Sequence, residues 1–234
     1  MRDGTHTATL KTSETNRDEV IKEMVGHEVS AERKTKSHRR DKVALEIENL
    51  STRSIVNNVS FSVNYGEVLG LSGLVGAGRT DTVAAIFGAR DRVNGTIRLE
   101  DREVDISSPK DAIDLGIGYI PEERRAEGIF PNMNVKENLT LPFMNTLVRF
   151  WDIISNAAEV DIVQKYIEEL DIKTPSLKQQ LEFLSGGNQQ KVILARWLAA
   201  NKDILIFDEP TRGIDVGVKE QIHDLIRNLA ETGM

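Results

Sequence analysis

Val68-Leu-Gly-Leu-Ser72, followed directly by Gly73-Leu-Val-Gly-Ala-Gly78-Arg79-Thr80, is the most informative part of this 234-residue sequence. The first five residues form a short apolar run that predicts a buried strand. Gly78 to Phe87 then have helical spacing, and Gly88 predicts the end of that helix. Between them, the loop fits the pattern G-x-x-x-x-G-K-[ST] at every position except Arg79. Strand, glycine-rich loop and helix follow one another in the order that this pattern requires.

The loop is a candidate site for the phosphates of a nucleotide. Glycine lets backbone amides close around phosphate oxygens, and the start of the helix adds a positive dipole. The Thr80 hydroxyl is expected to bind Mg²⁺. Arg79 keeps the charge of the usual lysine but replaces a compact ammonium by a wide planar guanidinium. An ordinary glycine-rich turn is the alternative for the loop taken alone. The candidate residues are Gly73, Leu74, Val75, Gly76, Ala77, Gly78, Arg79 and Thr80.

A pair of carboxylates follows a second apolar run. Ile204 to Phe207 has the length and composition of a central parallel strand, and Asp208 and Glu209 come directly after it. Open α/β sheets bind ligands at the carboxyl ends of their strands. Asp208 suits Mg²⁺ ligation, and Glu209 suits polarising the water that attacks a γ-phosphate. An acidic pair that caps a helix is the alternative.

Leu184-Ser-Gly-Gly-Asn-Gln-Gln-Lys191 opens another predicted helix before this pair. Ser185, Gly186 and Gly187 present a hydroxyl and unobstructed amides at a helix N-terminus, which is a second anion-binding surface. A lone Ser-Gly-Gly is a common loop. Three independent patterns in a consistent order, each on a suitable element, favour a nucleotide-binding domain instead.

Together these motifs resemble those of ATP-binding cassette (ABC) proteins. Leu184 to Lys191 is similar to their signature motif, Gly73 to Thr80 to Walker A, and Ile204 to Pro210 to Walker B. Gly213-Ile-Asp215 resembles the D-loop. Leu71 to Thr80 and Gly118-Tyr-Ile-Pro-Glu-Glu-Arg-Arg125 are similar, more closely, to the second nucleotide-binding domain of tandem bacterial importers for monosaccharides such as ribose, xylose and galactose.

The resemblance implies a fold, cofactors and site roles. The fold is α/β: a P-loop NTPase with a mixed central sheet, an antiparallel β subdomain and a helical subdomain that carries the signature. ATP and Mg²⁺ are the implied cofactors, with Thr80 and Asp208 on the metal. The implied catalytic group comprises Glu209, Glu122, Ser185, Gly186, Gly187 and Asp215.

Two departures from the family pattern affect the chain's own site. Glu122 stands where the family normally offers a glutamine, and it adds negative charge near the triphosphate. Because cassettes pair so that one domain's signature covers the other's phosphate loop, Ser185 to Gly187 are expected to complete a partner's site. Arg79 would then belong to a slower site that mainly holds nucleotide.

The resemblance also divides the chain. Residues 1–29 resemble the last strand and helix of a preceding first cassette, with a strand expected at Thr5 to Leu10 and a capped helix at Asn16 to Val25. Residues 30–42 are basic and lack apolar periodicity, which is typical of a solvated linker. Residues 43–234 resemble the second cassette, C-terminally truncated, with a helical insertion at about 122–190.

The expected function is an ATPase subunit that energises monosaccharide import. Its implied partners are the first ABC domain of the same polypeptide or a second copy, polytopic permease subunits, and indirectly a periplasmic sugar-binding protein. The implied location is peripheral, on the cytoplasmic face of the bacterial inner membrane. A non-hydrolysing regulatory half of the same transporter is one alternative. A soluble cassette protein that acts on ribosomes or DNA is another.

Composition narrows these alternatives. The net charge of -7 argues against a nucleic-acid partner, because phosphate neutralisation requires a basic surplus. No apolar run reaches the roughly 18 to 20 residues that span a bilayer, and the start lacks a signal peptide's apolar segment. The absence of cysteine excludes disulfides and thiolate metal sites.

The remaining periodicity predicts further elements. Alternating apolar residues predict strands at Val43 to Ile47 and Val59 to Val63. The other expected strands are Gly95 to Glu100 and Ile117 to Ile120, and the other expected helices are Ser108 to Gly116, Asp161 to Leu170, Asn188 to Ala200 and Val216 to Ala230.

Overall fold

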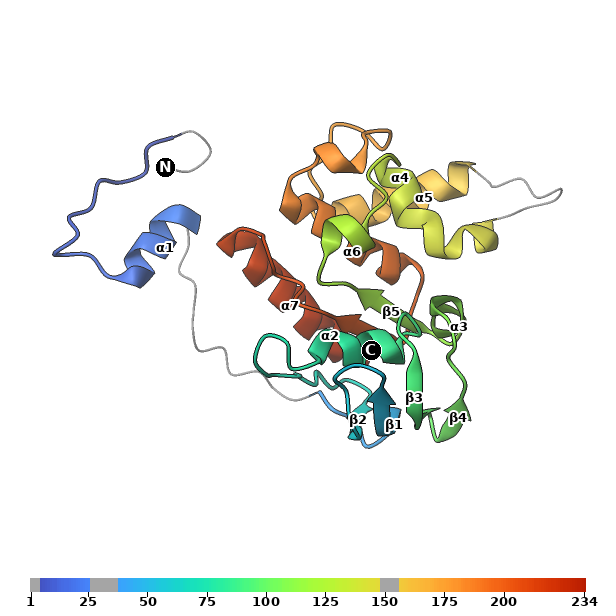
Figure 1. Ribbon diagram of the computed structural model, residues 1–234. Helices are drawn as coiled ribbons and strands as arrows, with labels where there is room; N and C mark the ends of the chain where they lie inside the picture. Colours follow the sequence, from blue (N-terminus) through green and yellow to red (C-terminus); the bar gives the residue numbers. More distant parts are fainter. Residues whose placement is uncertain (1–4, 26–37, 148–155) are drawn as a thin grey trace.

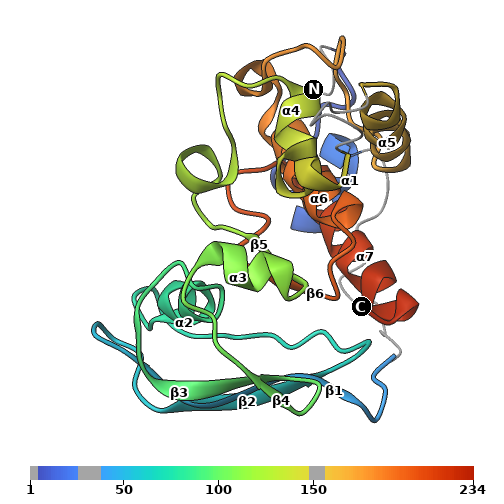
Figure 2. The ribbon, with the colours of Figure 1, turned by 90° about the vertical axis from the view of Figure 1, so that its right-hand side faces the viewer.

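The computed structural model describes residues 5–25, 38–147 and 156–234. Figure 2 shows three levels: an antiparallel sheet, helices α2 and α3 above it, and a group of helices, α4 to α6, at the opposite end. Two parallel strands, β5 and β6, lie between the sheet and that group. The α/β class expected from the sequence is therefore confirmed.

The antiparallel sheet contains β1 (Val43–Thr52), β2 (Val59–Asn64), β3 (Arg92–Leu99) and β4 (Arg102–Val104), in the order β2-β1-β3-β4. Leu45 and Ile47 of β1 are buried because successive side chains of a strand alternate between its faces. On the other face, Glu46 and Glu48 contact Nη1 of Arg98 at 3.2 and 2.8 Å. Period-two patterning thus predicted this sheet, although β3 begins three residues before the expected Gly95.

The parallel pair joins segments that lie far apart in the sequence. Strand β5 (Ile117–Ile120) aligns with β6 (Ile204–Phe207) so that Ile117 faces Ile204 and Ile120 faces Phe207. Helices α2 (Arg79–Ile86) and α3 (Pro109–Asp114) accompany the pair. Ser108 accepts a hydrogen bond from the backbone of Asp111 at the start of α3, as its sequence predicts.

The helical group consists of the π-helical turn η1 (Arg124–Gly128), α4 (Val135–Thr140), η2 (Leu141–Leu147), α5 (Asn156–Glu169), the short turn η4 (Leu181–Phe183) and α6 (Gly186–Ala199). Arg196 of α6 is buried and donates to the carbonyls of Asn138 and Gly128, both at 2.7 Å. Burial lowers the pKa of Arg196 to about 10. This guanidinium ties α6 to α4 and to the end of η1.

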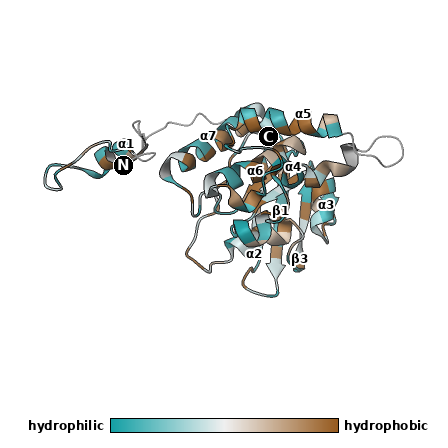
Figure 3. Cartoon of the chain, turned by 90° about the horizontal axis from the view of Figure 1, so that it is seen from above, coloured by the Kyte–Doolittle hydropathy of each residue, from teal (hydrophilic) through white to brown (hydrophobic). Residues whose placement is uncertain are grey.

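Helix α7 (Val216–Thr232) crosses the molecule beside β6, and α1 (Arg17–Val25) lies against α7 on the outside (Figure 1). Hydrophobic and hydrophilic residues alternate around α7 and α5 in Figure 3, as in helices that bury one face. Asn16 Oδ1 accepts from the backbone amide of Glu19 at 2.9 Å, so the expected cap of α1 is confirmed. Among the described helices none has the length and apolar content of a membrane span.

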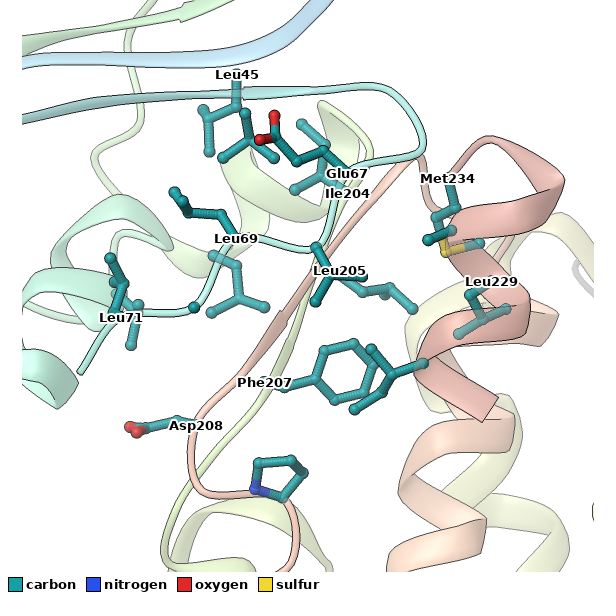
Figure 4. Close-up of a pocket in the computed structure, with 18 of the residues that line it drawn as sticks. Leu45, Glu67, Leu69, Leu71, Ile204, Leu205, Phe207, Asp208, Leu229 and Met234 are labelled. Carbon is teal, nitrogen blue, oxygen red and sulfur yellow. The ribbon is translucent and has the colours of Figure 1, made fainter. Parts of the chain in front are cut away.

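Two expected strands are corrected. Residues 6–10 and 68–72 are not in strands. Strand β6 pairs with β5 on one side, and on its other side a pocket of about 530 Å³ separates it from Leu69 and Leu71 (Figure 4). A strand needs a hydrogen-bonded neighbour for its backbone, and no strand in the described part of the chain pairs with 68–72. The apolar run is therefore not part of the described sheets.

The end of the expected linker is attached to the rest of the molecule. The backbone amide of Arg40 donates to the carbonyl of Tyr65 at 2.8 Å, and its guanidinium donates to the carbonyl of Thr232 at 3.3 Å. Lys42 pairs with Glu100. Residues 30–37 of the linker, and residues 1–4 and 26–29 of the expected first-cassette remnant, lie outside the described residues.

Candidate functional site

The glycine-rich loop leads from the unpaired 68–72 segment into α2, as its pattern predicts. Gly76 and Gly78 have φ angles of 81° and 85°, a left-handed conformation that glycine adopts without steric cost. Gly78 is the N-cap of α2 and provides no side-chain cap, so the first amides of the helix are available to an anion. Val75, at the tip of the loop, is 99% exposed.

Thr80, in the first turn of α2, contacts the carboxylate of Glu122, where the resemblance leads us to expect a glutamine. Its hydroxyl donates to Oε2 of Glu122 at 3.1 Å. Only Pro121 separates Glu122 from the end of β5, and Asp208 follows β6 directly. The parallel register of β5 and β6 therefore brings the two acids to the same edge of the strand pair as the loop.

Asp208 is a buried carboxylate. Tyr119 of β5 donates its hydroxyl to Asp208 Oδ2 at 3.1 Å, and Asp208 is only 6% exposed. Burial raises the pKa of Asp208, while the nearby hydroxyls of Thr80 and Tyr119 lower it in part. Burial and the neighbouring Asp208 also raise the pKa of Tyr119, which is therefore a hydrogen-bond donor throughout the physiological range.

Arg79 forms an ion pair with Glu209. Its Nη1 lies 2.7 Å from Glu209 Oε1, so the loop's cation is bound to the acid expected to polarise water. Glu209 has a φ of 46°, an uncommon backbone conformation that begins a tight turn. The Arg212 amide closes this turn by donating to the Glu209 carbonyl at 2.9 Å.

Arg212 supplies a second cation. Its Nη1 contacts Oε1 of Glu122, and it lies 2.8 Å from Oε1 of Glu123. The first residue of this turn, Glu209, therefore pairs with the phosphate loop, and the last residue, Arg212, pairs with Glu122 and Glu123.

The signature residues occupy another part of the molecule. Ser185 caps α6 and accepts from the side-chain amide of Asn188 at 2.9 Å. A Cβ on Gly186 would lie 3.4 Å from the carbonyl of Gly213, so the signature lies beside the D-loop of the same chain. Asp215 is the N-cap residue of α7. Within the described residues, no hydrogen bond or ion pair connects Ser185 to the phosphate loop.

The arrangement fits a magnesium ion that is shared with a nucleotide. No group of three or more His, Cys, Asp or Glu side chains within the described ranges forms a cage for a metal. Magnesium in phosphate sites commonly takes only one or two protein ligands, the rest being water and phosphate oxygens. The Thr80 hydroxyl and the buried Asp208 carboxylate suit that role.

A protein-family model with the description "ABC transporter" matches residues 56–212, which include every motif described above except Gly213–Asp215. The chain belongs to the ABC transporter family. The P-loop NTPase fold implied by the motifs is thereby confirmed.

Relatives of this ABC chain are named as sugar-import proteins. The ribose import ATP-binding protein of Geobacillus kaustophilus is 44% identical over 100% of this chain and 47% of that protein. The xylose import ATP-binding protein of Thermoanaerobacter pseudethanolicus is 42% identical over 100% of the chain and 48% of that protein. The chain therefore spans about half the length of the curated relatives it matches.

Solved structures support the fold. A dimeric ATP-binding cassette in a post-hydrolysis state with ADP and phosphate matches with a TM-score of 0.68 at 21% identity, covering 80% of this chain and 83% of that one. A nucleotide-free cassette from an ABC transporter matches with a TM-score of 0.69 at 22% identity, covering 82% and 79%.

Tyr119 and Arg212 are site residues that sequence reasoning missed. Tyr119 lies in the Gly118–Arg125 motif, and Arg212 directly precedes the Gly213–Asp215 motif. Both residues could therefore have been noticed beside known motifs. Their roles depend on which carboxylates face them across the fold, and a linear pattern does not contain that information.

Proposed function

We propose that this ABC chain binds ATP with Mg²⁺, hydrolyses it, and energises the import of a monosaccharide through a membrane permease. The observation that carries the proposal is the convergence of Arg79, Thr80, Glu122, Asp208 and Glu209 at one phosphate loop. The names of relatives that match over the whole chain support the cargo class.

In this proposal the chain's residues have separate tasks. The loop amides and Arg79 bind the triphosphate, and Mg²⁺ supplies charge neutralisation where Thr80 and Asp208 hold it. Glu209 orients the attacking water. It can do so only after the triphosphate has replaced Glu209 as the partner of Arg79. Glu122 lies where it can bind either the metal or that water. Asp215 begins α7 beside the signature and belongs to the contact with a second cassette.

The test of nucleotide binding uses the full chain and isothermal titration calorimetry with MgATP. We expect Thr80→Ala to weaken MgATP binding while leaving the affinity for metal-free ATP much less changed. The matched control is Thr82→Ala, because the Thr82 hydroxyl donates to the carbonyl of Gly78, the N-cap of α2, and not to a carboxylate. Equal losses from both variants, or no binding by the unaltered chain, would contradict the proposal.

We further propose that Ser185 to Gly187 complete the site of a partner cassette, either a preceding one in the same polypeptide or a second copy. Arg79 then belongs to a slower site. Its ion pair with Glu209 supports this division, because bound nucleotide must break the pair before Glu209 can act.

The division is tested in the complete transporter by comparing ATP turnover of Arg79→Ala and Ser185→Arg. We expect the signature variant to lose more activity. A larger loss from Arg79→Ala would show that the chain's own loop is the main site.

A non-hydrolysing regulatory half is the second candidate, and the same Arg79–Glu209 pair favours it. Turnover measured after inactivating the partner cassette separates the two. Residual hydrolysis that disappears on Glu209→Gln would exclude a purely regulatory role.

A further inference from the structure

The acids at the phosphate loop pose an electrostatic problem for an anionic ligand. Glu122 accepts a hydrogen bond from the Thr80 hydroxyl of α2 at 3.1 Å, and Glu123 is the next residue in the chain. Asp208 and Glu209 add two more carboxylates at the same edge. A nucleoside triphosphate is itself strongly negative, so uncompensated carboxylates within a few ångströms would weaken its binding.

The loop's own cation does not compensate Glu122. Arg79 pairs with Glu209 and not with the 122–123 acids. The cation that does contact them is Arg212, whose Nη1 faces Oε1 of Glu122 and lies 2.8 Å from Oε1 of Glu123. Arg212 thus holds the acid that contacts the phosphate-binding helix through Thr80.

Arg212 is well placed for this task because its backbone is constrained. The Arg212 amide donates to the carbonyl of Glu209 at 2.9 Å, which closes the turn directly after β6. The side chain is 54% exposed and Glu122 is 30% exposed, so the ion pair is solvated and contributes little to folding stability. Its effect should appear in the affinity for anions.

We propose that Arg212 is a positioning residue that neutralises Glu122 and holds its carboxylate through Oε1, so that the phosphate loop can bind a nucleoside triphosphate. The inference rests on the proposed nucleotide binding and deepens it. It assigns to the turn between β6 and the D-loop a role in substrate affinity. It also explains how the site accommodates a carboxylate at position 122.

The test is a double-mutant cycle in the full chain, with MgATP affinity measured by calorimetry at low ionic strength. The proteins are the unaltered chain, Arg212→Gln, Glu122→Gln and the double variant. We expect Arg212→Gln to weaken MgATP binding roughly fivefold when Glu122 is present, and less than twofold when position 122 is glutamine. High salt should reduce the fivefold difference.

Two further variants keep the result interpretable. Arg98→Gln removes an arginine that also contacts two glutamates, Glu46 and Glu48, on the outer face of the antiparallel sheet, and its MgATP affinity should be unchanged. Arg212→Lys retains the charge and should preserve most of the affinity. The melting temperatures of all variants should lie close to that of the unaltered chain.

The outcomes are distinct. If the unaltered chain binds no MgATP, the proposed function fails. If it binds MgATP and Arg212→Gln binds equally well, or loses the same factor in both backgrounds, the nucleotide-binding proposal stands and the role of Arg212 is overturned. A loss in Arg98→Gln equal to that in Arg212→Gln would also overturn it, because net charge alone would explain both.

Discussion

At the residue scale, Asp208 is a buried acid whose ionised form costs folding stability but suits the binding of a metal ion. A carboxylate that is 6% exposed would normally have a cationic partner, yet its described hydrogen-bond partners are neutral hydroxyls. Its burial favours the protonated form and raises its pKa. A divalent cation would relieve that cost, which is the physical reason for assigning Asp208 to Mg²⁺.

We expect Asp208→Asn to raise the melting temperature at pH 7 while weakening Mg²⁺-dependent nucleotide binding. For an acid whose folded pKa is raised, stability is lost as pH rises from its ordinary value of 3.8 through the folded pKa. The advantage of the asparagine variant should therefore disappear below that ordinary value. Calorimetric scans from acid to neutral pH measure this. A lower melting temperature at pH 7 would contradict the assignment.

Tyr119→Phe should lower the free energy of unfolding by about 1.5–3 kcal/mol at neutral pH, because it removes a hydrogen bond to a buried ionised group. Its ring contact with Phe87, at 5.2 Å between centroids, is retained by phenylalanine. Urea unfolding measures the loss. In the Asp208→Asn background the loss should shrink, and an equal loss there would exclude the carboxylate as the cause.

The close approach of α6 to β5 shows why a particular glycine is needed at the element scale. A Cβ on Gly118 would lie 2.7 Å from Leu205 of β6 and 3.0 Å from the indole of Trp197. Trp197 also meets Phe87 edge-on, with centroids 6.2 Å apart. The end of α6, the end of α2 and both parallel strands therefore share one packed contact.

Gly118→Ala should destabilise the fold by about 1–3 kcal/mol, because a packed interior has no room for a methyl group. Gly70→Ala is the matched control, since a Cβ there meets nothing within 4 Å. Urea unfolding of the two variants tests the difference. Equal stabilities would show that α6 can move away from β5 without cost.

At the scale of the whole molecule, the two candidate anion-binding regions are not joined by any hydrogen bond or ion pair among the described residues. The phosphate loop gathers Thr80, Glu122 and Glu209, whereas Ser185 to Gly187 lie beside Gly213 of the same chain. One copy therefore presents an open phosphate loop and a separate signature, which is the geometry needed for two cassettes to complete each other.

If copies of the chain complete each other's sites, ATPase activity per molecule should rise with protein concentration, since dimer population follows mass action. Activity measured across about a hundredfold range of concentration, chosen around the dimer dissociation constant, tests this. Ser185→Arg should bind MgATP normally yet lose the concentration dependence. Constant activity per molecule would indicate that each copy acts alone.

Much of the candidate site was predictable because it lies in local motifs. The order of the phosphate loop, signature and acidic pair, the capping of α1 and α3, and the strands β5 and β6 all follow from patterns within a few residues of each other. Hydrophobic periodicity and side-chain capping are short-range effects, so the sequence by itself determined these elements and, through the family motifs, the fold.

The tertiary structure alone decided which charges meet. Arg79 bonds Glu209 across 130 positions and Arg212 bonds Glu122 across 90, while the apolar run at 68–72 is left unpaired beside β6. Ion pairs and strand pairing depend on the partner that the fold brings near. The arginine of the phosphate loop could therefore be identified from the sequence, but its ion pair with Glu209 could not.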